Sequence, residues 1–167
     1  MSTINNLHDV YIENLKDMYS ANDQSHKVTL ELHEAATHPE LKKALKAGAE
    51  GIEKGQKAIT SVLAARDETP GGKHCKGMEG LVKEARAHGI KAEFGDSDAQ
   101  DAMIIAQYQR MVHYAIAGYG CAEAWAERLG YSECAEHLEK CLEDTRSGDS
   151  HMTDIATGKH GINAAAA

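Results

Sequence analysis

Long stretches without helix-breaking residues are the feature that most limits what this chain can fold into. Proline, which interrupts a helix most strongly, occurs only at Pro39 and Pro70 in 167 residues. Alanine, the best helix former, occurs 26 times, whereas valine occurs five times and phenylalanine once. Because β-branched and aromatic residues are the ones that favour strands, this chain is predicted to be all-α and able to form long uninterrupted helices.

Apolar residues recur at three- and four-residue steps in four long segments, which is the spacing of one helix face. Local signals mark their ends: Pro39 suits a first helical turn, Ser97 and Gln100 have the spacing of a capping box, Ser132 suits a helix cap, and Gly130 suits a helix end. The pattern predicts long helices over 5–37, 39–66, 97–129 and 132–157 and a short one over 78–88.

The links between these segments predict how the helices are arranged. The first and second long helices are joined at 37–38 and the last two at 130–131, so each pair should form an antiparallel hairpin. The two hairpins are joined by a longer connection that contains the loop 67–72 and the short helix. One long crossover is typical of the ferritin-like four-helix bundle, so we expect this fold as a single domain over 1–160, followed by an unstructured tail over 161–167.

Charge and hydropathy exclude several classes of protein. The chain has 26 acidic and 18 basic residues and a formal net charge of −8, which argues against a general nucleic-acid binder. No stretch approaches the ~18–20 apolar residues needed to span a bilayer, and residues 1–6 lack the basic and apolar regions of a leader, so we expect a cytoplasmic protein without a membrane partner. The four cysteines form no C-x-x-C pair and are expected to be small buried hydrophobes rather than metal ligands.

Several runs of residues resemble the bacterial ferritin-like stress proteins of the YciF type. The resemblance covers nearly the whole chain and implies a compact ferritin-like helical bundle, commonly a dimer and linked to stress responses, without a settled biochemical activity. The runs that carry it are Asp17–Ala21, Met78–Glu84, Asp101–Ala106, His113–Gly120, Leu129–Tyr131 and Met152–Ala156.

Ferritin-like bundles that perform chemistry hold two metal ions with inward-pointing carboxylates and imidazoles, commonly as Glu on one helix and E-x-x-H on another. The resemblance places such ligands at positions where this chain departs from the pattern. Asn22 replaces an acid on the first helix, Val112 and Ala115 replace two acids on the fourth, and Thr145 stands within the acidic cluster of the last. Buried carboxylates without metal are costly, so apolar replacements are consistent with a bundle that has lost its ions.

Three acidic residues are left as candidate remnants of the metal site: Glu50, Glu53 and Asp149. The competing interpretation of Glu50 and Glu53 is a solvated or salt-bridged helix face. A separate pair, Asp23 and His26, has metal-ligand spacing, although ten histidines on amphipathic helices produce one such spacing by chance.

Two hypotheses of function therefore follow from the sequence and the resemblance. The first is a structural or stress-response ferritin-like protein, a homodimer with a degraded dinuclear site, without cofactor and without catalytic residues. The alternative is a di-iron or di-manganese oxidoreductase or metal-storage protein, with a remodelled ligand set built on Glu50, Glu53 and Asp149 and extended by Asn22 and His113.

Overall fold

The described part of the protein, residues 3–167 of a computed structural model, is helical and contains no strand, which confirms the all-α prediction. Met1 and Ser2, which begin the segment predicted to carry no leader, lie outside the described residues. No helix within 3–167 combines the length and hydropathy needed to cross a bilayer. The elements in chain order are α1 (Leu7–Ala35), α2 (Pro39–Ala64), α3 (Lys76–Ala85), the π-helical turn η1 (Arg86–Ile90), α4 (Ser97–Arg128), α5 (Ser132–Thr157) and α6 (Ile162–Ala165).

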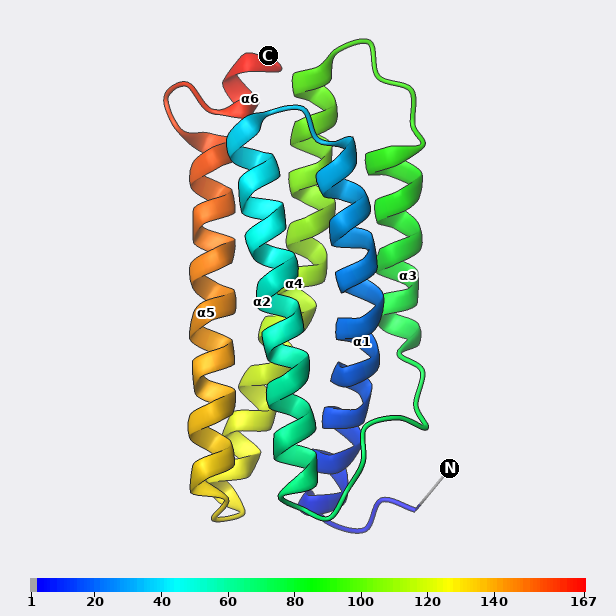
Figure 1. The fold of residues 1–167 in the computed structure, drawn as a ribbon, viewed down its shortest axis with the longest axis vertical. Helices are drawn as coiled ribbons and strands as arrows, with labels where there is room; N and C mark the ends of the chain where they lie inside the picture. Colours follow the sequence, from blue (N-terminus) through cyan, green and yellow to red (C-terminus); the bar gives the residue numbers. More distant parts are fainter. Residues whose placement is uncertain (1–2) are drawn as a thin grey trace.

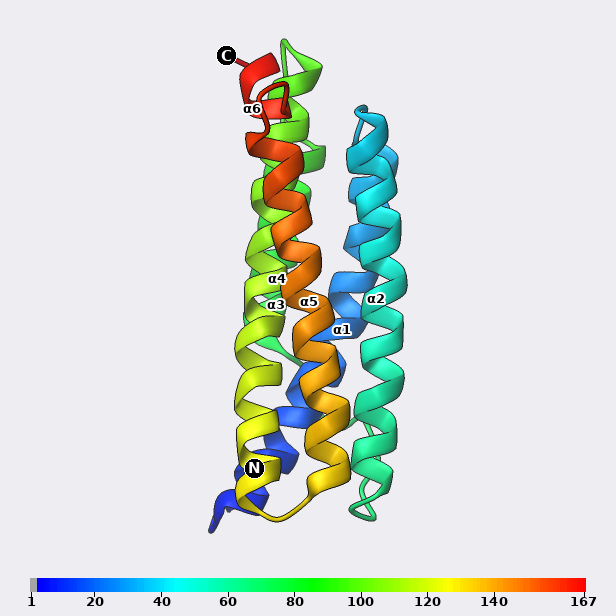
Figure 2. The same ribbon diagram turned by 90° about the vertical axis from the view of Figure 1, so that its left-hand side faces the viewer.

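Four long helices lie side by side along the molecule (Figures 1 and 2). α1 packs against α2 and α4 against α5, so both predicted hairpins are present, and the hairpins meet through α1 with α4 and α2 with α5. The short helix α3, between the hairpins in sequence, lies against α1 and α4 on the outside of the four long helices (Figure 1). The ends of α1, α2, α4 and α5 agree with the predicted segments to within a few residues.

Helix ends follow local chemistry, with two differences from prediction. Pro39 occupies the first turn of α2, and Gly130 adopts a φ of +76° after α4, as expected. The side chain that caps α4 is Asp96 rather than Ser97, and it accepts a hydrogen bond of 2.8 Å from the Ala99 N–H. Ser132 does not cap α5 but is its first residue, because the chain turns at Tyr131, one residue earlier than predicted.

The apolar interior is divided into two clusters. One lies toward the α1–α2 turn and includes Leu32, Leu41, Leu45, Ile104 and Met152, all almost fully buried. The other lies toward the opposite end and includes Tyr11, Leu15, Ile59, Leu63 and Leu138. The predicted helix faces supply both clusters.

Cys75 fastens the crossover to the long helices. Its buried thiol lies 3.1 Å from Asp17 Oδ2 on α1 and 2.9 Å from the Tyr114 hydroxyl on α4, and that hydroxyl donates to the same Asp17 oxygen at 2.6 Å. Burial raises the pKa of the Cys75 thiol, so the sulfur stays protonated and is not an activated nucleophile. All four cysteines are free, and Cys121 is exposed rather than buried as predicted.

The end of the chain corrects the prediction of an unstructured tail over 161–167. Residues Ile162–Ala165 form α6, which packs against α4 and α5. Ile162 is only 1% exposed and belongs to the apolar cluster near the α1–α2 turn. A four-residue helix is too short to produce a periodic pattern, and burial of the Ile162 side chain against the rest of the protein provides the stabilisation.

Candidate functional site

Polar side chains occupy the middle of the molecule. Asn22, Ser25 and Thr29 share one buried face of α1. The hydroxyls of Ser25 and Thr29 donate back to carbonyl oxygens of α1, at 3.3 and 2.8 Å, and are thereby satisfied within their own helix. Asn22 instead reaches across to α4, where its Nδ2 donates to the hydroxyl of Tyr119 at 2.9 Å.

Two tyrosines of α4 cross the centre of the molecule and end against glycines of α2. A Cβ atom placed on Gly48 would lie 2.1 Å from the Tyr108 hydroxyl, and one placed on Gly55 would lie 2.2 Å from the Tyr119 hydroxyl. Seven residues, or two helical turns, separate the glycines, so both lie on the same face of α2. The absence of a side chain at these two positions is what admits the phenol groups.

Burial keeps both phenols protonated at neutral pH. It raises the pKa of Tyr108 to about 12, with a smaller contribution from the Asp149 carboxylate. It also raises the pKa of Tyr119 well above the ordinary value, helped by Cys141, while the hydrogen bond from Asn22 acts in the opposite direction. The Tyr119 oxygen accepts a hydrogen bond, whereas the Tyr108 hydroxyl has no hydrogen-bond partner among residues 3–167.

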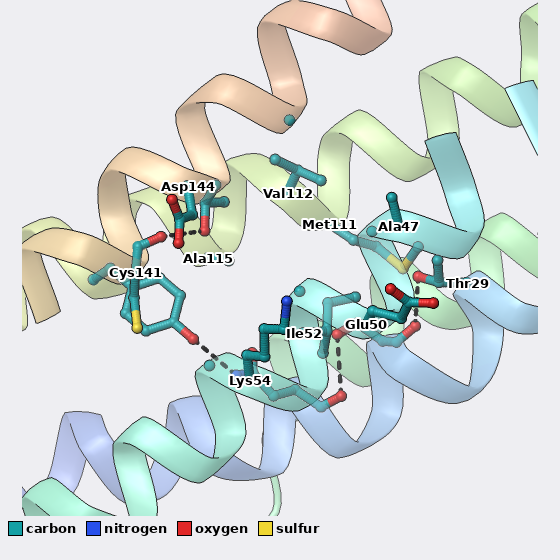
Figure 3. A pocket seen from close by; sticks show the side chains of 18 of the residues that line it. Thr29, Ala47, Glu50, Ile52, Lys54, Met111, Val112, Ala115, Cys141 and Asp144 are labelled. Atoms are coloured by element: carbon teal, nitrogen blue, oxygen red, sulfur yellow. Dashed lines mark hydrogen bonds between the residues drawn. The ribbon is translucent and has the colours of Figure 1, made fainter. Parts of the chain in front are cut away.

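A cavity of about 710 Å³ lies beside these tyrosines, between α2 and α5, and reaches inward to α1 and α4 (Figure 3). Its volume falls in the range of small-molecule sites, roughly 300–1,000 Å³. The wall formed by α2 is made largely of small residues: Ala44, Ala47, Gly48, Gly51, Gly55 and Ala58. Met111, Val112 and Ala115 of α4 form much of the inner surface, which is therefore mainly apolar.

The predicted metal-site remnants are at different places in the structure. Glu50 is exposed at the edge of the cavity. Glu53 is exposed outside the cavity and pairs at 2.6 Å with Lys57, whose hydrogen bond lowers the pKa of the Glu53 carboxyl. Asp149 of α5 lies 2.9 Å from His113 Nε2, and its other oxygen accepts a hydrogen bond from Gln109 at 3.0 Å.

The donor set does not fit a dinuclear metal centre. Within residues 3–167, no three His, Cys, Asp or Glu side chains come together in an arrangement that could hold an ion. Val112 and Ala115 present only carbon atoms to the cavity, and the Asn22 amide nitrogen is engaged by Tyr119. Asp23, considered with His26 as a ligand pair, forms an exposed ion pair with Lys27 at 2.7 Å.

The tyrosine–glycine contacts are the feature that sequence patterns missed. Tyr108 and Tyr119 fall on the apolar stripe of their helix and are indistinguishable there from ordinary core residues. The available signal lies in α2, where Gly48 and Gly55 interrupt a helix at a spacing of two turns. Glycine costs a helix about 1 kcal/mol relative to alanine, so such a pair indicates that something approaches the backbone closely.

The class of this protein is defined by two long helical hairpins, a short helix between them and the sequence runs that resemble YciF-type proteins. Comparison with known proteins places the chain in this class. Residues 6–167 match the family described as Domain of unknown function (DUF892), and the chain belongs to this family. It is similar to Protein YciF of Escherichia coli (strain K12), with 32% identity over 151 residues and 90% of each chain covered.

Two solved structures share the fold. The crystal structure of the E. coli stress protein YciF matches with a TM-score of 0.85 and 31% identity, covering 91% of this chain and 95% of that one. YcfI from Rhodopseudomonas palustris matches with a TM-score of 0.86 and 29% identity, covering 92% of this chain and 97% of that one. These similarities confirm the YciF-type resemblance inferred from the sequence runs.

Proposed function

We propose that this chain is a ferritin-like structural protein of a stress response, which acts in the cytoplasm as a homodimer and has lost the dinuclear metal site. Two relatives support this role, since YciF of E. coli is described as a stress protein and YcfI of R. palustris is provisionally described as a structural protein. The net charge of −8 disfavours nucleic acid as a partner. No catalytic residue and no cofactor are part of the proposal.

The observation that carries this proposal is which side chains occupy the space between the four long helices. The Asn22–Tyr119 hydrogen bond and the side chain of Val112 occupy the region where the family resemblance implies metal ligands. An amide–phenol pair and an apolar side chain are stable there without an ion, whereas a cluster of carboxylates would require one. The centre is thus suited to maintaining the fold rather than to binding metal.

Metal loading tests this proposal directly. Untagged protein purified without chelator, and the same protein incubated with ferrous or manganous salt and desalted, should contain much less than one metal ion per chain by elemental mass spectrometry. Because only a ligand bound to the native state raises its stability, EDTA should leave the melting temperature unchanged. Two iron or manganese ions per chain, or a drop of several degrees in EDTA, would overturn the proposal in favour of the di-iron or di-manganese alternative.

The homodimer is tested separately by analytical ultracentrifugation. Apart from Ile4 near the N-terminus, Leu30 on α1 is the only large apolar side chain within residues 3–167 that is classed as exposed. We expect a dimer at micromolar concentration and a weaker dimer in the variant Leu30→Lys, because a charge at an apolar contact is costly to desolvate. A wild-type monomer at this concentration would contradict the proposed assembly.

A further inference from the structure

The cavity between α2 and α5 contains polar groups without partners. Tyr108 is only 5% exposed, and its hydroxyl points to the α2 wall of the cavity at Gly48. No acceptor for its proton lies among residues 3–167. Because this hydroxyl opens on the cavity and donates to none of the described residues, a bound molecule with an acceptor oxygen can take its hydrogen bond.

The charged groups at the cavity favour an anion. The amine of Lys54 points into the cavity (Figure 3) and forms no ion pair within the described chain, and Lys43 is likewise unpaired there. Lys140 is neutralised by Asp144. Glu50 is then the remaining acidic group of the lining against two cations without an ion pair. The Asp149 carboxylate, which acts on Tyr108 from outside the lining, is paired with His113, so the balance of charge at the cavity favours an anion.

The shape and lining favour a single hydrocarbon chain. The small residues from Ala44 to Ala58 follow α2 for about 21 Å at 1.5 Å per residue. An acyl chain spans half of a ~30 Å bilayer core, so about 15 Å of chain and its head group fit this length. Met111, Val112 and Ala115 make the inner surface mainly apolar, which suits a hydrocarbon chain. The Ser25 and Thr29 hydroxyls beside them already donate within α1.

We propose that this cavity binds one long-chain carboxylic acid. Its hydrocarbon chain lies against the small residues of α2 and the apolar inner surface, and its carboxylate accepts hydrogen bonds from the Lys54 ammonium and the Tyr108 hydroxyl. This binding site goes beyond the proposed structural role. It shares the cavity with Glu50 and Val112, but Lys54 and Tyr108, the two groups that hold the carboxylate, are not candidate metal ligands, so fatty-acid binding and metal content are measured independently.

Titration with cis-parinaric acid, a fluorescent polyunsaturated fatty acid, tests for the site. We expect saturable binding of one molecule per chain and displacement by palmitate. The blocking variant is Gly51→Leu, because a Cβ atom at Gly51 meets nothing within 4 Å and the longer side chain enters the cavity. The matched control is Gly80→Leu, an equally unobstructed and exposed glycine on α3. Gly51→Leu should weaken binding at least about tenfold, as expected for a filled cavity, and Gly80→Leu should bind like the wild type.

The head-group contacts are tested by comparing an acid with the alcohol of the same chain length. Lys54→Met should weaken palmitate binding roughly tenfold or more, the loss expected for a charge-assisted hydrogen bond, and should leave 1-hexadecanol binding unchanged. Tyr108→Phe should weaken palmitate binding about two- to tenfold without lowering the melting temperature, because its hydroxyl has no partner in the unliganded protein.

Three results would overturn the proposal: no saturable binding, equal binding by Gly51→Leu and the wild type, or equal losses for acid and alcohol in Lys54→Met. Sedimentation of Gly51→Leu supplies a fourth. If this substitution dissociates a wild-type dimer, a second copy of the chain covers the cavity and the fatty-acid site is wrong. Metal content reports only on the proposed structural function, so the failures of the two proposals are distinguishable.

Discussion

At the scale of single residues, two glycines of α2 explain how tyrosines can cross the centre of the molecule. Gly48 and Gly55 each face a phenol oxygen at a distance that excludes a Cβ atom. Gly51, between them on the same helix, faces open space. The same residue type therefore has opposite significance at neighbouring positions of one helix, and only the surrounding side chains distinguish them.

We predict that three Gly→Ala substitutions in α2 differ in the sign of their effect on the free energy of unfolding. Gly51→Ala should raise the free energy of unfolding by up to about 1 kcal/mol, since alanine favours the helix and nothing obstructs its Cβ. Gly48→Ala and Gly55→Ala should lower it by about 1–3 kcal/mol, because Tyr108 and Tyr119 must move. Urea denaturation monitored by circular dichroism measures all three, and stabilisation by Gly48→Ala would show that Tyr108 does not occupy this position.

At the scale of elements, a buried carboxylate holds the α1–α2 turn against α4. Asp101 is completely buried, and its two oxygens accept hydrogen bonds from the Thr37 N–H at 2.9 Å, the Thr37 hydroxyl at 2.7 Å and the His38 N–H at 2.8 Å. These bonds join residues more than 60 positions apart in sequence. They connect the two hairpins at one end of the molecule, as Cys75 connects the crossover to both hairpins.

Replacing this carboxylate should loosen the connection. Asp101→Asn removes the charge and one acceptor oxygen while keeping the size, so we expect a loss of about 2–4 kcal/mol in the free energy of unfolding. The control Asp23→Asn disrupts only an exposed pair with Lys27 and should change stability by less than about 0.5 kcal/mol. Chemical denaturation compares the two variants, and equal effects would contradict the role given to Asp101.

At the scale of the whole molecule, burial of ionisable side chains makes stability dependent on alkaline pH. A tyrosine or cysteine whose pKa is raised in the folded state contributes stability that is complete below its unfolded pKa and is lost as the pH rises through the folded value. Tyr108 shows this with a pKa of about 12 against an ordinary 10. Burial raises the pKa in the same direction for Tyr11, Tyr114, Tyr119, Cys75 and Cys141.

We therefore predict that the free energy of unfolding falls progressively as the pH rises above the ordinary pKa values of these groups, 9 for the thiols and 10 for the phenols. The variant Tyr108→Phe isolates one phenol. Its stability relative to the wild type should improve as the pH rises from 10 toward 12, because the wild type alone must keep this group protonated. Urea denaturation across this range measures the difference, and a constant difference would contradict the buried placement of Tyr108.

Helix identity and pairing could be predicted from local sequence. Apolar residues at helical spacing, the position of Pro39 and the left-handed turn at Gly130 all act within a few residues of one another, so no distant contact was needed to recognise them. Where two neighbouring residues could both cap a helix, the predicted cap lies one residue after the observed one, as at Asp96 and Tyr131. The short helix α6 was missed because its stability comes from distant partners of Ile162.

The sequence by itself thus determined that the chain is helical, which segments pair, and that acids are missing at the positions where the family resemblance implies metal ligands. Tertiary structure alone decided where the remaining groups lie: Glu53 at the surface with Lys57, Asp149 with His113, and Tyr108 unpaired beside a cavity. The physical reason is the distance along the chain over which each interaction acts. Helix formation depends on neighbours within one or two turns, whereas hydrogen-bond partners, burial and cavities depend on which side chains of different helices meet.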